Sequence, residues 1–396
     1  MNKKNKIRVL YFGTYSRGEE YARNLALING LKNLGAEVEE CHTELFPKHK
    51  DKMQAAKQSF FANIFALLTA YLRLIRAYLR AGDFDFIFVG YIGQLDVFLA
   101  RLLKIFHQKP IIFDAFYSLY DTMVKDRALY SESSLMASLL RLLDRFSIRC
   151  SDLALLDTNE HIKYFCNKFG LEPERFLAVP LGVDQDNFYP RSSVGSRGIR
   201  GIAPPAPEED EVFEVVNYSS YIPLHGIEVI LKAADLLRQD KSIHFTLIGK
   251  GQLYPEMRTL ALKLGLENVN FVEWLNHREL VEKAAAADVL LGIFGTTEKA
   301  SRVIPYKAYE ALALAKPLIT GLSPAARELL EDGKHCLLSP MGDEKALADK
   351  ILLLKKSPEL RKSIAQQGHQ LFLEKCSWES IATAILKKLN EKFGAN

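Results

Sequence analysis

The sequence predicts an α/β protein made of two Rossmann-like, doubly wound parallel-sheet domains that face a cleft. Short strand-like runs alternate with helical patterns in both halves of the chain, which is typical of parallel α/β sheets. One segment rich in Gly, Pro, Ser and charge, residues 191–211, interrupts this alternation near the middle and reads as a linker. With 396 residues, each half is long enough to bury its own core.

The first half supplies five expected strands. IRVLYFG at residues 7–13 is the first, and a helix follows over residues 21–34, with Gly35 as its stop. The other expected strands are short, apolar and rich in β-branched or aromatic residues, as buried parallel strands are: residues 84–90, 109–116, 152–157 and 176–182. We place the N-terminal domain at residues 1–190.

The second half restarts the pattern. VFEVVNYS is an expected strand, IEVILKAADLLRQ an amphipathic helix, and IHFTLIGKG a strand that ends in a glycine turn. VNFVEW, DVLLGIF and PLITG continue the sheet. We place the C-terminal domain at residues 212–375. A closing helix within residues 376–396 is expected to pack back on the N-terminal domain.

Composition excludes several classes of protein. The net charge of +4 is too small to indicate nucleic acid, so no such partner is expected. The five cysteines are widely spaced without a C-x-x-C pair, so neither a zinc site nor a redox dithiol is expected. This cysteine pattern leads us to expect that the protein is located in the reducing cytoplasm. The longest uncharged stretch, residues 58–72, is shorter than the roughly 20 residues that a spanning helix needs.

Glycines at strand ends are candidates for phosphate contact. Gly13 ends the first strand, Gly249 and Gly251 flank Lys250, and Gly226 opens a helix. Glycine lets backbone N–H groups approach a phosphate, although most strand-end glycines only form tight turns. The chain contains neither G-x-G-x-x-G after the first strand nor a P-loop, which disfavours dinucleotide and P-loop binding.

A cluster of charge precedes an expected helix at residues 306–315. Arg302 and Lys307 stand beside the helix start, where two cations and a helix N-terminus favour a diphosphate. Glu310 lies one turn inside, where a carboxylate could accept both hydroxyls of a ribose. The alternative is a solvated helix start with an internal Lys307–Glu310 pair.

Four segments of the second half resemble the retaining glycosyltransferase family 4 (glycosyl transferases group 1), which has the GT-B fold: YSSYIPLHGIEVILKAADLL, LIGKGQLYPEMRTLALKLGLENVNFVEWL, YEALALAKPLITG and SWESIATAILKKL. The resemblance covers nearly all of residues 212–389. It extends more loosely to the first half through residues 7–41 and 179–188.

The resemblance implies a hexosyltransferase-like enzyme of polysaccharide biosynthesis. The C-terminal domain would bind a nucleotide-diphosphate sugar as donor, and the N-terminal domain would bind a glycan or lipid-linked acceptor. The reaction would need no cofactor and no metal, and it would retain the configuration at the anomeric carbon. It further implies that Glu310 binds the donor ribose and that the loop from Arg302 to Tyr306 wraps the diphosphate. Cations and helix dipoles would then stabilise the departing nucleotide diphosphate.

Three positions depart from the family pattern. Arg302 replaces the first glutamate of the E-x7-E motif, which ends at Glu310. Ser219, Ser220 and His225 stand where an arginine and a lysine are usual. We hypothesise that the positive charge of the usual arginine and lysine is supplied here by Arg302 and Lys307. His225 would be a third donor or simply a surface residue.

The third departure is a missing histidine in the first domain. After the strand that ends at Phe113 the region holds Asp114 instead, at the carboxyl end of a strand, where site residues gather. Asp114 is expected to orient the acceptor hydroxyl or to contact the sugar, or else to be a turn carboxylate or helix cap. The candidate catalytic residues are therefore Asp114, Arg302 and Lys307. The candidate donor-binding residues are Gly13, His225, Gly249, Lys250, Arg302, Tyr306, Lys307 and Glu310.

Residues 52–80 form an expected basic amphipathic helix. Its predicted apolar face contains Phe60, Ile64, Leu67 or Leu68, Tyr71, Ile75 and Leu79, with arginines on another face. Such a helix is typical of attachment to an anionic membrane, here on the inner face, or of an ordinary core helix with solvated arginines.

Other functions remain open at this stage. A nucleotide-sugar epimerase or a sugar phosphorylase would have the same fold, although no cofactor lysine or phosphate site of a phosphorylase is found. The missing histidine and first glutamate would also suit a donor-binding scaffold without turnover.

Overall fold

The computed structural model describes residues 6–16, 22–44, 60–191 and 212–394, without the side chains of residues 60–64. It divides the chain into two compact units. Unit 1 consists of Met1–Gly182 with Trp378–Asn396, and unit 2 of Val183–Ser377. The change from one unit to the other thus falls before the predicted linker, of which residues 192–211 lie outside the described part.

Unit 1 contains a parallel sheet in the order β2-β1-β3-β4-β5-β6. The strands are β1 (Arg8–Gly13), β2 (Glu37–His42), β3 (Phe86–Val89), β4 (Ile111–Phe116), β5 (Leu153–Leu156) and β6 (Phe176–Ala178). β1 to β5 pair through parallel ladders, for example Val9 with Phe86 and Ile87 with Ile111, and the register between β4 and β5 shifts between Asp114 and Phe116. The central strands are buried on both faces, which explains their continuous apolar sequences.

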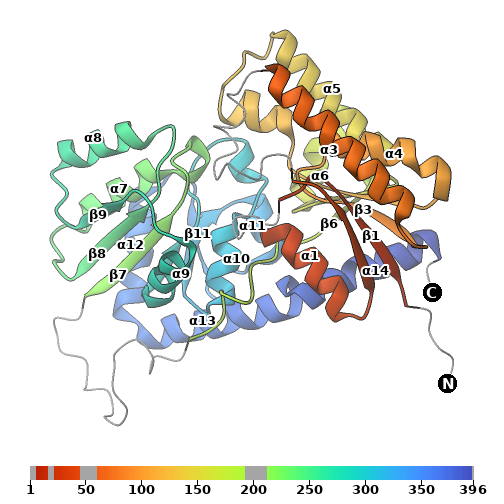
Figure 1. Ribbon diagram of the computed structural model, residues 1–396. Helices are drawn as coiled ribbons and strands as arrows, with labels where there is room; N and C mark the ends of the chain where they lie inside the picture. Colours follow the sequence, from red (N-terminus) through yellow and green to blue (C-terminus); the bar gives the residue numbers. More distant parts are fainter. Residues whose placement is uncertain (1–5, 17–21, 45–59, 192–211, 395–396) are drawn as a thin grey trace, which may run out of the picture. The chain divides into compact units, whose positions relative to one another are not determined.

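Helices cover both faces of this sheet (Figure 1). α3 (Phe60–Arg80), α4 (Asp96–His107), α5 (Leu135–Cys150) and α6 (Asn159–Phe169) share one core with Leu10 and Phe12 of β1. α1 (Ala22–Asn33) and α14 (Trp378–Phe393) share the opposite core with Val9 and Tyr11. This alternation along β1 follows from the two-residue period of a strand. A π-helix, η2 (Asp121–Asp126), and a 3₁₀ turn, η3 (Pro173–Arg175), complete the unit.

α14 returns the chain to unit 1 after unit 2 is complete. It packs against α1 so closely that a Cβ atom on Gly30 would lie 2.9 Å from the carbonyl carbon of Trp378. Ile381, Ala382 and Ile385 add to the core on this face. Only glycine at position 30 permits this approach of the two backbones.

Unit 2 contains a second parallel sheet, in the order β12-β11-β10-β7-β8-β9. Its strands are β7 (Phe213–Tyr218), β8 (Ile243–Ile248), β9 (Val269–Val272), β10 (Val289–Leu291), β11 (Leu318–Leu322) and β12 (Leu337–Pro340). Its helices are η4 (Pro223–His225), α7 (Ile227–Leu236), α8 (Tyr254–Leu264), α9 (His277–Ala286), η5 (Lys299–Ser301), α10 (Tyr306–Ala313), α11 (Pro324–Leu329), α12 (Glu344–Lys356), α13 (Pro358–Leu371) and η6 (Phe372–Cys376). α7, α8, α12 and α13 share one core with β7 and β8.

These two sheets confirm the predicted fold class of two Rossmann-like, doubly wound domains. Two strands at the sheet edges, β2 and β12, were not predicted. Within the described ranges, no helix has both the length and the apolar composition needed to cross a bilayer.

The basic helix predicted at residues 52–80 is present from Phe60 onward as α3, and its residues 52–59 lie outside the described part. The predicted apolar face needs correction. Tyr71 and Ile75 are partly buried against the core of unit 1, whereas Phe65 and Leu72 are exposed. One side of α3 therefore packs on the core and another side faces solvent. Tyr71 and Ile75, which were predicted to lie on one exposed apolar face, belong partly to the core side.

Candidate functional site

In unit 2 the strand order reverses between β7 and β10. The chain first builds β7, β8 and β9 in one direction and then returns to add β10, β11 and β12 on the other side of β7. The loops after β7 and β10 therefore leave neighbouring strands in opposite directions. In doubly wound sheets, ligands bind at the carboxyl ends of the strands beside this reversal.

A buried asparagine joins the ends of these two strands. The side-chain amide of Asn217 donates hydrogen bonds to the carbonyl oxygens of Leu291 and Gly292, at 3.0 and 3.3 Å. The Ser219 hydroxyl donates to the Asn217 side-chain oxygen at 3.0 Å. This network fixes the exit of β7 relative to the exit of β10.

Glycines bring three loops into close contact at this edge. Gly226 has a φ of +66°, and a Cβ atom there would lie 2.5 Å from the carbonyl carbon of Phe294. Gly249 has a φ of +114° and packs against the backbone of Ser219 in the same way. The loops after β7, β8 and β10 thus meet here because these positions have no side chain. Gly249 lies where the sequence placed it, in the turn after a strand.

Glu310 reaches from α10 to the end of β7. Its Oε2 atom accepts a hydrogen bond of 2.8 Å from the Tyr218 hydroxyl. Burial raises the pKa of Glu310 to about 7, although the Tyr218 hydrogen bond and the Lys307 charge favour the ionised form. Burial and the neighbouring Glu310 raise the pKa of Tyr218. The carboxylate therefore stands at the reversal of the sheet, and its role at a donor ribose remains a prediction.

Lys307 lies one helical turn before Glu310 and is only 5% exposed. Its ammonium nitrogen makes no hydrogen bond to any residue that the structure describes. Burial lowers the pKa of Lys307 to about 7, while the nearby charge of Glu310 opposes this shift. A buried amine without a hydrogen-bond acceptor is unfavourable by itself, and an anionic ligand would supply the missing acceptor.

Arg302 caps the short helix η5, four residues before α10 begins at Tyr306. Its side chain is 12% exposed, and its Nη1 atom lies 3.6 Å from Oε2 of the exposed Glu298. Tyr306 is the first residue of α10 and is half-buried. Arg302, Tyr306, Lys307 and Glu310 therefore lie within one loop–helix segment, as predicted, although Arg302 pairs with a carboxylate of its own loop.

Two other predicted donor residues have partners elsewhere. The His225 ring contacts the Ser220 carbonyl oxygen within its own loop. Lys250 lies 3.7 Å from Glu273, and both side chains are largely exposed. Neither has a described contact with Glu310 or Lys307. The donor-binding role of His225 and Lys250 remains a prediction.

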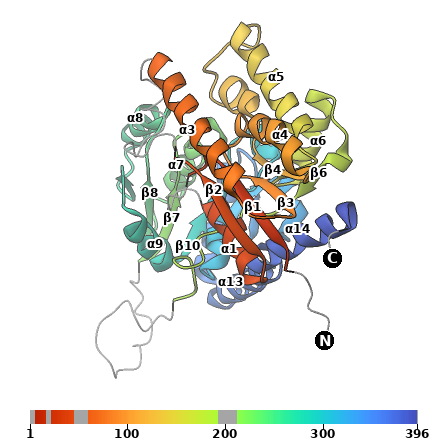
Figure 2. The ribbon, with the colours of Figure 1, turned by 45° about the vertical axis from the view of Figure 1, so that its right-hand side comes forward.

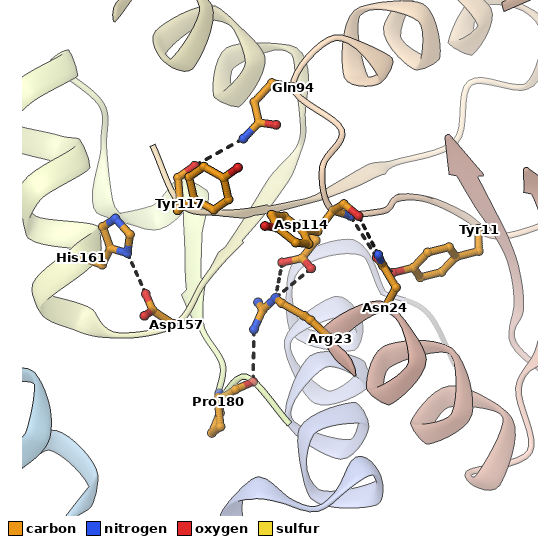
Figure 3. Close-up of polar contacts among 10 residues, drawn as sticks. Tyr11, Arg23, Asn24, Gln94, Asp114, Tyr117, Asp157, His161 and Pro180 are labelled. Atoms are coloured by element: carbon orange, nitrogen blue, oxygen red, sulfur yellow. Dashed lines mark hydrogen bonds and ion pairs between the residues drawn. The ribbon is translucent and has the colours of Figure 1, made fainter. Parts of the chain in front are cut away.

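In unit 1, Asp114 is buried in the core of the carboxyl edge of the sheet (Figure 3). Both of its oxygens accept hydrogen bonds from Nε of Arg23, at 2.7 and 2.8 Å, and Arg23 also donates to the Pro180 carbonyl oxygen at 3.2 Å. Burial raises the pKa of Asp114, and the Arg23 charge opposes this. Asp114 is thus tied to α1 by an ion pair, and its expected role at the acceptor hydroxyl remains a prediction.

Two further polar groups at this edge were missed from the sequence. Arg23 lies in α1, where its charge gave no signal because an amphipathic helix usually carries arginine toward solvent. His161 lies in α6, and its Nδ1 atom is 2.7 Å from Oδ1 of the equally buried Asp157 (Figure 3). The aspartate that ends a strand, followed four residues later by histidine, is the signal that could have found this pair.

Gly13 lies at the end of β1 with a φ of +134°. A Cβ atom there would come within 2.7 Å of the Asp96 carboxylate. The backbone N–H and the hydroxyl of Thr14 both donate to that carboxylate, at 2.6 and 2.9 Å. The first N–H after Gly13 is therefore already bonded to an acidic group, and contact between Gly13 and the donor remains a prediction.

The described residues contain no cluster of three or more histidine, cysteine, aspartate or glutamate side chains suited to a metal ion. The metal independence that the family resemblance implies remains a prediction.

Known proteins resemble this chain in sequence over unit 2 and in fold over nearly its whole length. The family model described as "Glycosyl transferases group 1" matches residues 202–371, which includes nearly all of unit 2. Two solved structures share the fold over almost their entire length. HepE of Anabaena has a TM-score of 0.66 at 16% identity, covering 98% of this chain and 100% of that one. Sucrose-phosphate synthase of Thermosynechococcus elongatus has a TM-score of 0.68 at 17% identity, covering 99% and 100%.

Curated relatives are also glycosyltransferases. An uncharacterized glycosyltransferase of Methanocaldococcus jannaschii is 27% identical over 43% of this chain and 46% of its own. An MMP α-(1→4)-mannosyltransferase of Mycolicibacterium hassiacum is 26% identical over 54% of this chain and 48% of its own. The matched segment thus spans about half the length of these relatives.

Proposed function

We propose that this protein is a glycosyltransferase that moves a sugar from a nucleotide-diphosphate sugar to a glycan or lipid-linked acceptor, without a metal and with retention at the anomeric carbon. The observation that carries the proposal is the pair of Lys307 and Glu310 at the strand reversal of unit 2, within the segment that matches the glycosyltransferase model. A buried amine in need of an acceptor and a carboxylate one turn away suit a phosphate and a ribose.

In the proposed roles, different parts of residues 302–310 bind the diphosphate and the ribose of the donor. Arg302, Lys307 and the N-terminus of α10 bind the diphosphate, and Glu310 accepts hydrogen bonds from the ribose hydroxyls. As the bond to the sugar breaks, negative charge grows on the diphosphate. Fixed cations and helix N–H groups stabilise this charge without rearrangement, which is the usual basis of electrostatic catalysis. Unit 1 would hold the acceptor.

The comparisons support a nucleotide sugar as the donor. HepE of Anabaena has been crystallised with UDP and with UDP-glucose, and several curated relatives are named as glycosyltransferases of lipopolysaccharide core or colanic acid biosynthesis. We transfer the class of donor to this chain, and leave the base and the sugar to experiment.

The donor class can be measured with a thermal-shift panel of UDP-, GDP-, ADP- and dTDP-sugars on the full chain. A ligand that binds only the folded protein raises its melting temperature as its concentration exceeds Kd. We expect one base to stabilise the protein clearly more than the others. Release of free sugar or transfer from that donor would then establish turnover. Stabilisation without turnover would indicate a donor-binding scaffold, and no stabilisation by any donor would contradict the proposal.

Binding of the donor is expected to take up protons at pH 8. With a pKa lowered to about 7, Lys307 is mostly neutral at this pH in the free protein. A bound diphosphate favours the charged ammonium and raises this pKa, so Lys307 gains a proton. Glu310, with a pKa of about 7, is already mostly ionised at pH 8 and contributes little.

The uptake is measured by titration calorimetry in buffers of different ionisation enthalpy. The observed enthalpy should change with the buffer in wild type and lose this dependence in Lys307→Met. Lys263→Met, which removes an exposed lysine on α8 of the same unit, should retain it. An equal buffer dependence in wild type and Lys307→Met would show that Lys307 does not receive the phosphate.

A further inference from the structure

The outer surface of unit 1 has an unusual row of exposed apolar side chains on α3. Phe65, Leu68 and Leu72 are between 56% and 73% exposed, while Leu74 on the opposite side of the helix is buried in the core. Arg76 follows Leu72 by four residues and therefore lies in the same row. A helix whose apolar side faces water as well as the core has more apolar surface than folding requires.

The same feature continues on the two helices that follow in this layer. α4 packs against both α3 and α5, and the three lie together in both views (Figures 1 and 2). On α4, Leu102, Ile105 and Phe106 are between 60% and 64% exposed. On α5, Leu139 and Phe146 are 50% and 45% exposed. We call the outward sides of α3, α4 and α5 together the outer face.

Charge on the outer face has one sign. Its exposed cations are Arg73, Arg76, Arg80, Arg101, Arg141 and Arg149. Two carboxylates occur in these helices, Asp96 and Asp144. Both are buried, and both accept hydrogen bonds from other residues of unit 1. The exposed side chains of the three helices therefore combine large apolar groups with arginine and include no acid.

From this charge and apolar surface we propose that the outer face of unit 1 binds an anionic phospholipid bilayer. Leu and Phe side chains would enter the headgroup boundary while the arginines contact lipid phosphates. A second copy of the chain fits less well, because a two-fold contact would place arginines of the outer face against the same arginines. The inference goes beyond the proposed function, since membrane attachment and donor binding belong to different units.

The test is sedimentation of the full chain with vesicles of phosphatidylcholine alone or mixed with phosphatidylglycerol. Wild type should bind the mixed vesicles, and salt should weaken this binding. Leu102→Glu with Phe106→Glu should reduce it at least about tenfold, because two apolar contacts are replaced by negative charge. Arg76→Gln with Arg149→Gln should reduce it ~30-fold, at about 1 kcal/mol for each arginine near an anionic surface.

Matched controls come from unit 2. Leu262, which is 77% exposed on α8, and the exposed Arg278 offer Leu262→Glu and Arg278→Gln, which should bind vesicles like wild type. Donor-induced thermal shifts should be unchanged in every variant, which separates this inference from the proposed function and shows that the variants fold. Equal binding to neutral vesicles, or wild-type binding by both outer-face variants, would overturn the inference. A dimer that Leu102→Glu abolishes, without vesicle binding, would assign the outer face to self-association instead.

Discussion

Arg302→Ala is expected to weaken the binding of the stabilising nucleotide sugar by about 10- to 150-fold. Hydrogen bonds from a charged group contribute about 1.5–3 kcal/mol, and this range corresponds to that loss of affinity for a single bond. In the free protein the Nη1 atom of Arg302 lies 3.6 Å from Oε2 of Glu298, and because this carboxylate is exposed the pair should contribute only about 0–1 kcal/mol to stability. The loss of this one pair should therefore lower stability much less than the loss of a phosphate contact lowers affinity.

Titration calorimetry and thermal melting of the same samples measure the two effects. Glu298→Ala is the matched control, because it removes the carboxylate beside Arg302 and leaves the arginine; its affinity should equal or exceed that of wild type. Wild-type affinity in Arg302→Ala would refute the hypothesis that positive charge has moved to this position. A fall in melting temperature with unchanged affinity would instead assign Arg302 to the local structure of its loop.

Asp114→Ala should lower the free energy of unfolding of unit 1 by about 3–5 kcal/mol, because it leaves the buried Arg23 charge without its partner. Replacing both partners with apolar side chains, in Arg23→Met with Asp114→Leu, should restore much of this loss. The expectation follows from burial: both side chains are at most 1% exposed, so water cannot replace the lost interaction.

The two tryptophans allow the loss to be assigned to one unit. Trp378 lies in α14 of unit 1 and is buried, whereas Trp274 lies in unit 2 and is exposed. In a Trp274→Phe background, fluorescence during urea unfolding reports unit 1 alone. If Asp114→Ala unfolds at the wild-type urea concentration but loses sugar transfer, the ion pair is not structural and the predicted catalytic role gains support.

Much of the fold follows from local patterns in the sequence. The buried strands β3 and β5 are entirely apolar, and β1 and β4 are apolar apart from Arg8 and Asp114, so they could be predicted without knowledge of distant residues. β2 was missed because it lies at the sheet edge, where EVEECH keeps three glutamates partly in solvent and shows no apolar run. β12 is also an edge strand and is only four residues long.

The candidate site was only partly predictable, for a different reason. Arg302, Lys307 and Glu310 are close in sequence, so the spacing of a helix was enough to group them. The partners that decide their chemistry are not close. Tyr218 contacts Glu310 from 92 residues away, and Arg23 contacts Asp114 from 91 residues away. Sheet topology creates these contacts, and one sequence without a structure does not specify which side chains it brings together.

The return of α14 to unit 1 sets an order for folding during synthesis. α14 leaves the ribosome only after all of unit 2, and until then Val9, Tyr11 and Leu27 lack the helix that completes their core. Unit 2 is continuous in sequence and is fully synthesised before that moment. The nascent chain therefore carries an incompletely covered unit 1 throughout the translation of nearly half its length. Chaperones that recognise apolar segments would find their target on the α1 side of this sheet.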